Sequence, residues 1–158
     1  MINALEKFSY PTLKSRPLTL IHEIPILRTE KYWNKLGRGE IYATKCIRCN
    51  TIYYPPQIDC ISCLTSQHMK WIKLSNEGII ETFTQVHLKP QGFTNCEYNY
   101  IIGIARVPEG VKVMGWFLNT NVKDVYIGMH VKILGKITSD NFHLIIFEPY
   151  KGKPLNKK

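Results

Sequence analysis

The residues best suited to chemistry in this sequence are two Cys-x-x-Cys pairs. The first pair is Cys46 and Cys49, and the second, after ten intervening residues, is Cys60 and Cys63. Two residues between thiolates let one turn offer two sulfurs to a single ion, and two such turns complete a tetrahedron with bonds of ~2.3 Å. The four cysteine sulfurs would occupy all four coordination positions of the ion. The pattern therefore predicts a structural metal site without an open position for activating water.

Zinc is the predicted metal of this site. Iron in a rubredoxin-like site is the alternative because its ligands are the same, and disulfides or redox-active thiols are a third interpretation. A segment of ~25 residues with few apolar side chains cannot fold on burial alone, and zinc contributes on the order of 10 kcal/mol to such a module. Asn50 follows the first pair where left-handed backbone is usual, and Asn tolerates it. Leu64 at the equivalent position predicts a looser or differently turned second pair.

Recognisable catalytic motifs are absent from the sequence. It contains no Gly-rich phosphate loop, no Ser nucleophile elbow and no His-Glu-x-x-His. The five histidines are scattered along the chain. The sequence therefore predicts a protein that is not an enzyme.

The composition is that of a globular protein with a basic balance. The chain has 158 residues, with 21 Lys and Arg against 12 Asp and Glu. The excess favours contact with phosphates in nucleic acid, a phosphorylated cofactor or an anionic surface, although a Lys-rich surface also simply maintains solubility. No stretch approaches the ~20 apolar residues of a membrane span, and the N-terminal residues lack the apolar core of a signal peptide. We expect a cytoplasmic protein, where paired cysteines bind metal more often than they form disulfides.

The elements that must position the cysteines follow from the rest of the pattern. An irregular lead broken by prolines precedes a helix expected at 29–36, with Thr29 as its N-cap and Gly37 as its C′ residue. From residue 70 onward, segments rich in Ile, Val, Thr, Tyr and Phe predict strands at 70–74, 78–88, 100–107, 111–118, 130–136 and 142–148.

Five or six such strands, with short turns and no room for crossover helices, predict a small closed barrel. The longer connection at 89–99 is the expected binding loop. The predicted organisation is a lead and helix at 1–39, a metal ribbon at 40–69, a barrel at 70–150 and a basic flexible tail at 151–158.

The order of these features resembles the family once catalogued as domain of unknown function 35 (DUF35), the acyl-CoA-associated zinc-ribbon and OB-fold proteins. The resemblance runs from about residue 29 to 149 and rests on the two cysteine pairs together with Tyr32-Trp33, Tyr53-Tyr54-Pro55-Pro56, Trp71, Thr82-Phe83-Thr84, Pro108-Glu109-Gly110 and Ile127-Gly128-Met129. This sequence departs from the family in its longer lead and in Asn50 and Leu64, where members often have Gly.

The resemblance implies a mainly β fold: an N-terminal helical segment, a rubredoxin-like zinc ribbon and a C-terminal OB-fold barrel of five strands. Members often work beside thiolase-fold enzymes. Archaeal relatives are thought to bridge acetoacetyl-CoA thiolase and hydroxymethylglutaryl-CoA synthase, and bacterial relatives accompany hydratases or aldolases of steroid side-chain breakdown. The implied role is a non-catalytic scaffold or accessory subunit that binds a thiolase-like enzyme and helps to accommodate acyl-CoA.

Candidate contacts to acyl-CoA are basic, because coenzyme A carries phosphate groups. Lys45 and Arg48 flank the first cysteine pair, and Lys89 and Phe93 lie in the long connection; each is also interpretable as an ordinary surface residue. The alternative function is nucleic-acid binding, since a zinc ribbon, an OB-fold and positive charge are its usual ingredients. The strands lack a dense set of aromatic residues interleaved with Lys and Arg, which favours the scaffold.

Overall fold

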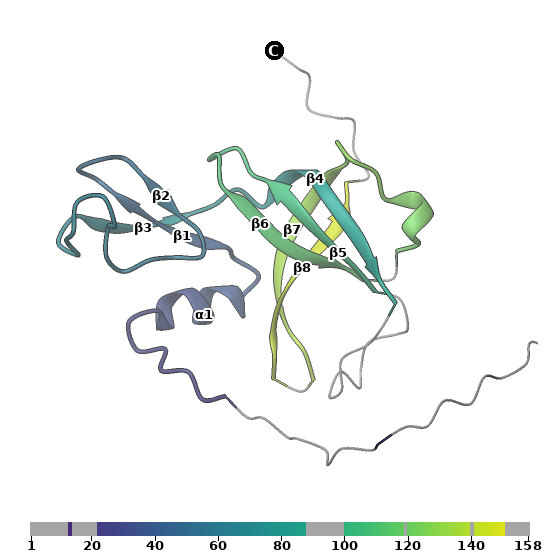
Figure 1. Cartoon of the computed structure of the whole chain (residues 1–158), viewed down its shortest axis with the longest axis horizontal. Helices are drawn as coiled ribbons and strands as arrows, with labels where there is room; N and C mark the ends of the chain where they lie inside the picture. Colours follow the sequence, from purple (N-terminus) through teal and green to yellow (C-terminus); the bar gives the residue numbers. More distant parts are fainter. Residues whose placement is uncertain (1–12, 14–21, 88–99, 119, 140, 151–158) are drawn as a thin grey trace, which may run out of the picture.

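The computed structural model describes residue 13 and residues 22–87, 100–118, 120–139 and 141–150. Within these residues the chain forms one α-helix, a three-stranded sheet and a closed five-stranded barrel. Figure 1 shows the sheet and the barrel side by side, with the helix at their junction. The mainly β architecture expected from the sequence is therefore confirmed. No helix in the described part of the chain is long and apolar enough to cross a membrane.

Helix α1 spans Glu30–Leu36 and is preceded by Thr29 at the N-cap position. The Thr29 hydroxyl makes no capping bond to the helix backbone. Instead it accepts a hydrogen bond from the Trp33 indole N–H at 3.3 Å and donates one to the carbonyl of Ile26 at 3.3 Å. The residue expected as a cap thus fixes the ring of Trp33 and the turn that leads into the helix.

Helix α1 ends at Leu36 as the sequence predicted, but the left-handed residue that follows it lies two positions later than expected. Gly37 keeps a right-handed helical backbone, with φ of −62°, so its expected role as the left-handed C′ residue is wrong. Gly39 takes that role, with φ of +84°. Its N–H donates to the Leu36 carbonyl and the N–H of Glu40 donates to the Lys35 carbonyl, both at 3.0 Å. This pair of bonds is a Schellman motif, which needs a residue free of Cβ strain at Gly39 and not at Gly37.

The three-stranded sheet, here called the ribbon sheet, carries the cysteines. It consists of β1 (Tyr42–Cys46), β2 (Ile52–Tyr53) and β3 (Met69–Lys73), in the order β2-β1-β3, with both pairings antiparallel. Strand β3 is the strand expected at 70–74, and it pairs with β1 along its whole length. We predicted the boundary between ribbon and barrel to fall between residues 69 and 70, and both of these residues lie in β3.

The barrel contains β4 (Glu77–Val86), β5 (Tyr100–Arg106), β6 (Lys112–Phe117), β7 (His130–Ile137) and β8 (His143–Pro149). Its order is β4-β5-β6-β8-β7, closed by the pairing of β7 with β4, and only β6 and β8 run parallel. A short 3₁₀ helix, η1 (Val122–Asp124), lies in the connection from β6 to β7. The five-stranded barrel is confirmed; the expected loop at 89–99 and the tail at 151–158 lie outside the described residues.

The core of the barrel follows from alternation along its strands. Buried and more exposed residues alternate in β5 and β6, as expected when one face of each strand points inward. Phe147 is 1% exposed and packs edge-to-face on Phe117, with ring centroids 5.4 Å apart. The same core cluster continues through Tyr32, Leu36 and Ile41 of the helix and its exit. Barrel and helix are therefore stabilised by one continuous apolar core.

Helix α1 joins the ribbon sheet to the barrel by close contacts. The backbone of Gly135 in β7 lies directly against Leu36, so that a Cβ at this position would collide with the Leu36 carbonyl. Trp33 packs edge-to-face on His143 of β8, with centroids 5.5 Å apart. On the ribbon side, the hydroxyls of Tyr32 and Tyr54 lie 3.1 Å apart. The helix thus fixes the metal-binding module relative to the barrel.

Candidate metal centre

The four thiols predicted from the two pairs come together in the structure. Cys46 ends β1, Cys49 lies in the turn that follows, and Cys60 and Cys63 lie in a second turn. All four sulfurs lie within 4.8 Å of one another, with Cys46–Cys63 at 3.9 Å and Cys49–Cys60 at 3.5 Å. In a regular tetrahedron with bonds of ~2.3 Å the sulfurs are about 3.8 Å apart. The spacing therefore fits a metal ion with four thiolate ligands.

The two cysteine turns are built in the same way. In each, the N–H of the first cysteine donates to the carbonyl five residues later: Cys46 to Thr51 at 2.9 Å, and Cys60 to Thr65 at 3.0 Å. Asn50 and Leu64 occupy equivalent positions and both have a left-handed backbone, with φ of 60° and 51°.

The expectation that Leu64 would make the second turn looser or different is wrong. Converging two thiols on one point requires the left-handed residue, and this requirement overrides the side-chain preference. Leu64 is 88% exposed, so the cost of that conformation is limited to the local strain between its Cβ and its own backbone.

The environments of the four thiols differ. Cys46 and Cys60 are buried, whereas Cys49 is exposed. The hydroxyl and then the backbone of Thr51 lower the pKa of Cys49 to about 6. A hydrogen bond with the Tyr53 hydroxyl lowers the pKa of Cys60. Burial, followed by the neighbouring thiols, raises the pKa of Cys63 to about 12. Because ligands must be deprotonated, binding of a metal would release protons and would weaken in acid.

The segment between the two turns is fixed to the ribbon sheet. The buried hydroxyl of Thr44 donates to the Gln57 carbonyl at 2.7 Å and accepts from the Gln57 N–H at 3.0 Å. Next to this segment, Asp59 pairs with Arg28 at 3.2 Å on the surface. These contacts hold the second cysteine turn at the correct distance from the first.

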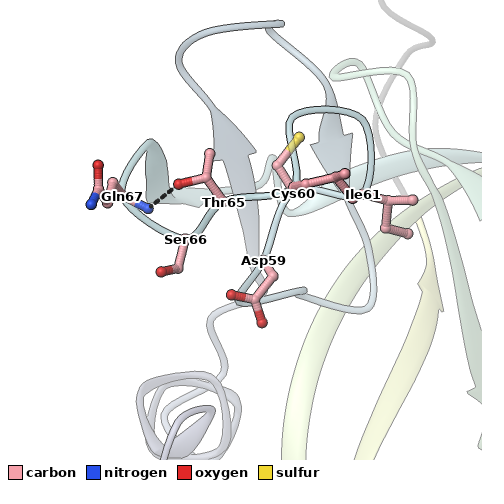
Figure 2. Close-up of a pocket in the computed structure, with 7 residues that line it drawn as sticks. Asp59, Cys60, Ile61, Thr65, Ser66 and Gln67 are labelled. Carbon is pink, nitrogen blue, oxygen red and sulfur yellow. Dashed lines mark hydrogen bonds between the residues drawn. The ribbon is translucent and has the colours of Figure 1, made fainter.

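An open depression of about 600 Å³ lies beside the second cysteine turn, lined by residues 59–61 and 64–67. Figure 2 shows its lining side chains, with the Gln67 backbone N–H donating to the hydroxyl of Thr65 at 3.2 Å. Cys60 and Asp59 are the titratable groups of this lining, and Asp59 is paired with Arg28. The lining therefore offers no nucleophile and base in a catalytic arrangement.

The predicted ligand contacts do not converge on this depression. Lys45 lies in β1, between Ile52 of β2 and Lys70 of β3. Arg48 is exposed in the first cysteine turn. Lys89 and Phe93 lie outside the described residues, so all four assignments stay predictions.

Two residues that the sequence did not assign to the metal site lie against the sulfurs. The Thr51 hydroxyl is 3.2 Å from the Cys49 sulfur, and the Tyr53 hydroxyl is 3.3 Å from the Cys60 sulfur. The only signal in the sequence was their nearness to the first cysteine pair. The fold was needed to bring Tyr53 to a thiol seven residues away.

A four-thiol ribbon joined to a closed five-stranded barrel defines a zinc-ribbon and OB-fold protein. Residues 33–68 match the family model of the ChsH2 rubredoxin-like zinc ribbon domain, and residues 71–136 match that of the ChsH2 C-terminal OB-fold domain. The ribbon match and the thiol cluster together indicate a site for zinc or a similar metal.

Two curated relatives are DUF35 domain-containing scaffold proteins. The one from Methanocaldococcus jannaschii is 32% identical over 116 residues, covering 73% of this chain and 82% of the relative. The one from Methanothermobacter thermautotrophicus is 22% identical over 128 residues, covering 80% and 96%. The chain belongs to the DUF35 family, as its sequence features suggested.

Two solved structures share the fold. The Ltp2-ChsH2(DUF35) aldolase superposes with a TM-score of 0.66 and 18% identity, over 76% of this chain and 92% of that one. A DUF35 protein of unknown function from Sulfolobus solfataricus superposes with a TM-score of 0.55 and 17% identity, over 78% and 86%. At these identities the likeness concerns the fold alone.

Proposed function

We propose that this chain is a non-catalytic scaffold or accessory subunit that binds a thiolase-like acyl-CoA enzyme in the cytoplasm. The observation that carries the proposal is its 32% identity to a DUF35 scaffold protein over 82% of that relative. A family member is also named together with an aldolase in a solved structure. Hydroxymethylglutaryl-CoA synthase is the second enzyme that such a scaffold would hold beside a thiolase.

Zinc is the metal we propose for the ribbon, with iron as the alternative. The ligands are Cys46, Cys49, Cys60 and Cys63, whose four sulfurs leave no position open. Such an ion cross-links the two cysteine turns and supplies folding free energy. The ribbon residues then present a fixed surface to a partner.

The outer side of strands β5 and β6 supports binding to another protein. Ile102 and Ile104 of β5 pair with Trp116 and Met114 of β6, and these outward positions are apolar. Met114 is 60% exposed. We call this surface the β5–β6 face. The outer side of β7, by contrast, carries Lys132 and Lys136, which are exposed.

Charged residues border the β5–β6 face at one end. Glu81 of β4 pairs with Arg106 at 2.8 Å and with Lys112 at 2.7 Å, so two cations share one carboxylate. An apolar centre with a charged rim is typical of protein interfaces. This face therefore suits an apolar patch of the enzyme that is bordered by carboxylates.

Acyl-CoA contact is the finer part of the proposal. Lys45, Arg48, Lys89 and Phe93 are the proposed contacts. Helix α1 adds a shallow depression of about 350 Å³, lined in part by Lys31, Lys35 and Arg38. Such cations suit the phosphates of coenzyme A.

The division of the chain into lead and helix, ribbon, barrel and tail also stays a prediction.

The test is co-purification of the full chain with the thiolase-fold enzyme of the same genome, with stoichiometry measured by light scattering. Substituting Met114→Glu places a charge at the centre of the β5–β6 face and should abolish the complex while the isolated chain stays folded. Lys132→Glu on the opposite side of the barrel is the matched control and should bind normally.

The nucleic-acid alternative makes a different prediction. Oligonucleotide affinity should fall steeply with salt, with log K decreasing in proportion to the number of phosphate contacts. Tight oligonucleotide binding at physiological salt, without association with a CoA enzyme, would refute the scaffold proposal.

A further inference from the structure

Two hydroxyl groups approach the thiol cluster from outside the set of four ligands. The Thr51 hydroxyl oxygen lies 3.2 Å from the sulfur of Cys49. The Tyr53 hydroxyl oxygen lies 3.3 Å from the sulfur of Cys60. Both residues belong to the same short stretch of chain, which leaves the first cysteine turn and enters β2. One segment therefore contacts a sulfur of each cysteine turn.

The direction of these two hydrogen bonds is fixed once a metal is bound. A ligating thiolate carries no proton, so it can only accept, and the hydroxyls of Thr and Tyr must donate. Four thiolates around a divalent ion carry a net charge of about −2. Burying this charge is unfavourable without hydrogen-bond donors. The backbone N–H of Cys63 is a further donor, to the Cys60 sulfur at 3.4 Å.

The two hydroxyls serve thiols in contrasting surroundings. Cys49 is exposed, and Thr51, whose hydroxyl contacts its sulfur, is exposed as well. Cys60 is 1% exposed, so water can donate far fewer hydrogen bonds to its sulfur than to the sulfur of Cys49. The two sulfurs are also neighbours, 3.5 Å apart. The donors thus reduce the repulsion between these two sulfurs, one from each turn.

The tyrosine is held in place by the ribbon sheet. Tyr53 pairs with Thr44 of β1. Tyr54, just beyond the end of β2, has its hydroxyl 3.1 Å from that of Tyr32 in helix α1. One tyrosine therefore contacts the metal cluster and the other contacts the helix.

We propose that Thr51 and Tyr53 are hydrogen-bond donors to the metal ligands, which orient Cys49 and Cys60 and slow the loss of the metal. They are positioning residues, not ligands, and the proposal rests on the metal site of the proposed function. Replacing hydrogen-bond partners of metal ligands typically weakens metal binding 10–100-fold. A comparable loss is expected here for each residue.

The experiment compares Thr51→Val and Tyr53→Phe in the full-length, metal-loaded chain. Thr65→Val and Tyr54→Phe are matched controls, because they remove the same hydroxyl types from the ribbon, where these hydroxyls contact the Gln67 N–H and the Tyr32 hydroxyl instead of a sulfur. Competition with a chelator of known affinity should show roughly 10–100-fold weaker zinc binding for the two test variants. In the cobalt-loaded chain, the sulfur-to-metal charge-transfer bands should shift in the test variants only.

Equal zinc affinity and unchanged cobalt spectra in both folded test variants would overturn the proposal and leave the scaffold function standing. If the unsubstituted chain bound no metal, the metal part of the proposed function would fail as well. Loss of partner association with metal retained would contradict only the proposed scaffold. Thr51 is exposed, so Thr51→Val remains decisive even if Tyr53→Phe fails to fold.

Discussion

The ribbon sheet and the barrel lie side by side but bury very different amounts of apolar surface. Strand β2 has two residues, and the buried residues of β1 are Ala43, Thr44 and Cys46. The barrel buries large side chains from all five of its strands, among them Ile80, Ile101, Val113, Ile133 and Phe147. The comparison indicates that burial stabilises the barrel, whereas the ribbon needs bound metal to be stable.

The largest expected effect is loss of the ribbon on removal of a ligand. Cys60→Ser, or extraction of the metal by a chelator, should remove on the order of 10 kcal/mol from the ribbon. Hydrogen exchange should then become fast in β1, β2 and β3 and stay slow in β7 and β8. Cys96→Ser, which alters a cysteine outside both pairs, is the control. Equal loss of protection in the barrel would show that the two regions do not differ as described.

The opposite experiment removes a large side chain from the barrel core. Phe147→Ala should lower the free energy of unfolding by about 3–5 kcal/mol, because the ring is fully buried and the cavity cannot close completely. Urea denaturation measures this effect. Met114→Ala, at an exposed position of the same barrel, should change the stability by about 0.5 kcal/mol or less. A small effect of Phe147→Ala would contradict the assignment of barrel stability to this core.

The junction of the two regions is tested by a smaller change. Gly135→Ala places a Cβ against the Leu36 carbonyl and should lower stability by about 1–3 kcal/mol as α1 shifts away from the barrel. Gly37→Ala is the control, since its backbone is already helical and its new Cβ would crowd the end of the flexible Ile137 side chain, with the Trp33 carbonyl at an ordinary 3.6 Å. Thermal unfolding of both variants gives the comparison. Equal stability would mean that helix and barrel are not closely packed.

The smallest effect concerns ion pairs on the ribbon side of α1. Hydrogen bonds from Lys73 at 2.6 Å and then from Lys35 at 3.0 Å lower the pKa of Glu40. A carboxyl whose folded pKa is depressed contributes stability above its unfolded pKa of about 4.3, and this stability is lost as the pH falls through the lower folded value.

Glu40→Gln should therefore lower the melting temperature slightly at pH 7. The difference from the unsubstituted chain should vanish once the pH falls below the depressed folded pKa of Glu40. Glu148→Gln, at an exposed position in β8, is the control. A difference that persists in acid would indicate a packing role for Glu40 instead of a charge effect.

Much of the fold was predictable because it depends on local signals. Residue types and their alternation placed β3 and the five barrel strands to within a few residues, and the Cys-x-x-Cys spacing identified the thiol cluster. The two errors have different origins. Gly39, and not Gly37, is the left-handed residue after the helix, a choice between two nearby glycines that the Schellman bonds decide. Leu64 adopts a left-handed backbone that its own preference disfavours, because the second cysteine turn repeats the geometry of the first.

The sequence by itself determined which four cysteines come together, the order of helix, ribbon and barrel, and the family to which the chain belongs. Residue types and their spacing suffice for these features because each depends on a few neighbouring positions. Only the tertiary structure decided that β3 completes the ribbon sheet, that Leu36 packs on Gly135, and that the hydroxyls of Thr51 and Tyr53 reach the sulfurs. These features depend on which distant segments meet, and that is set by burial of the shared core and convergence of four thiols on one point.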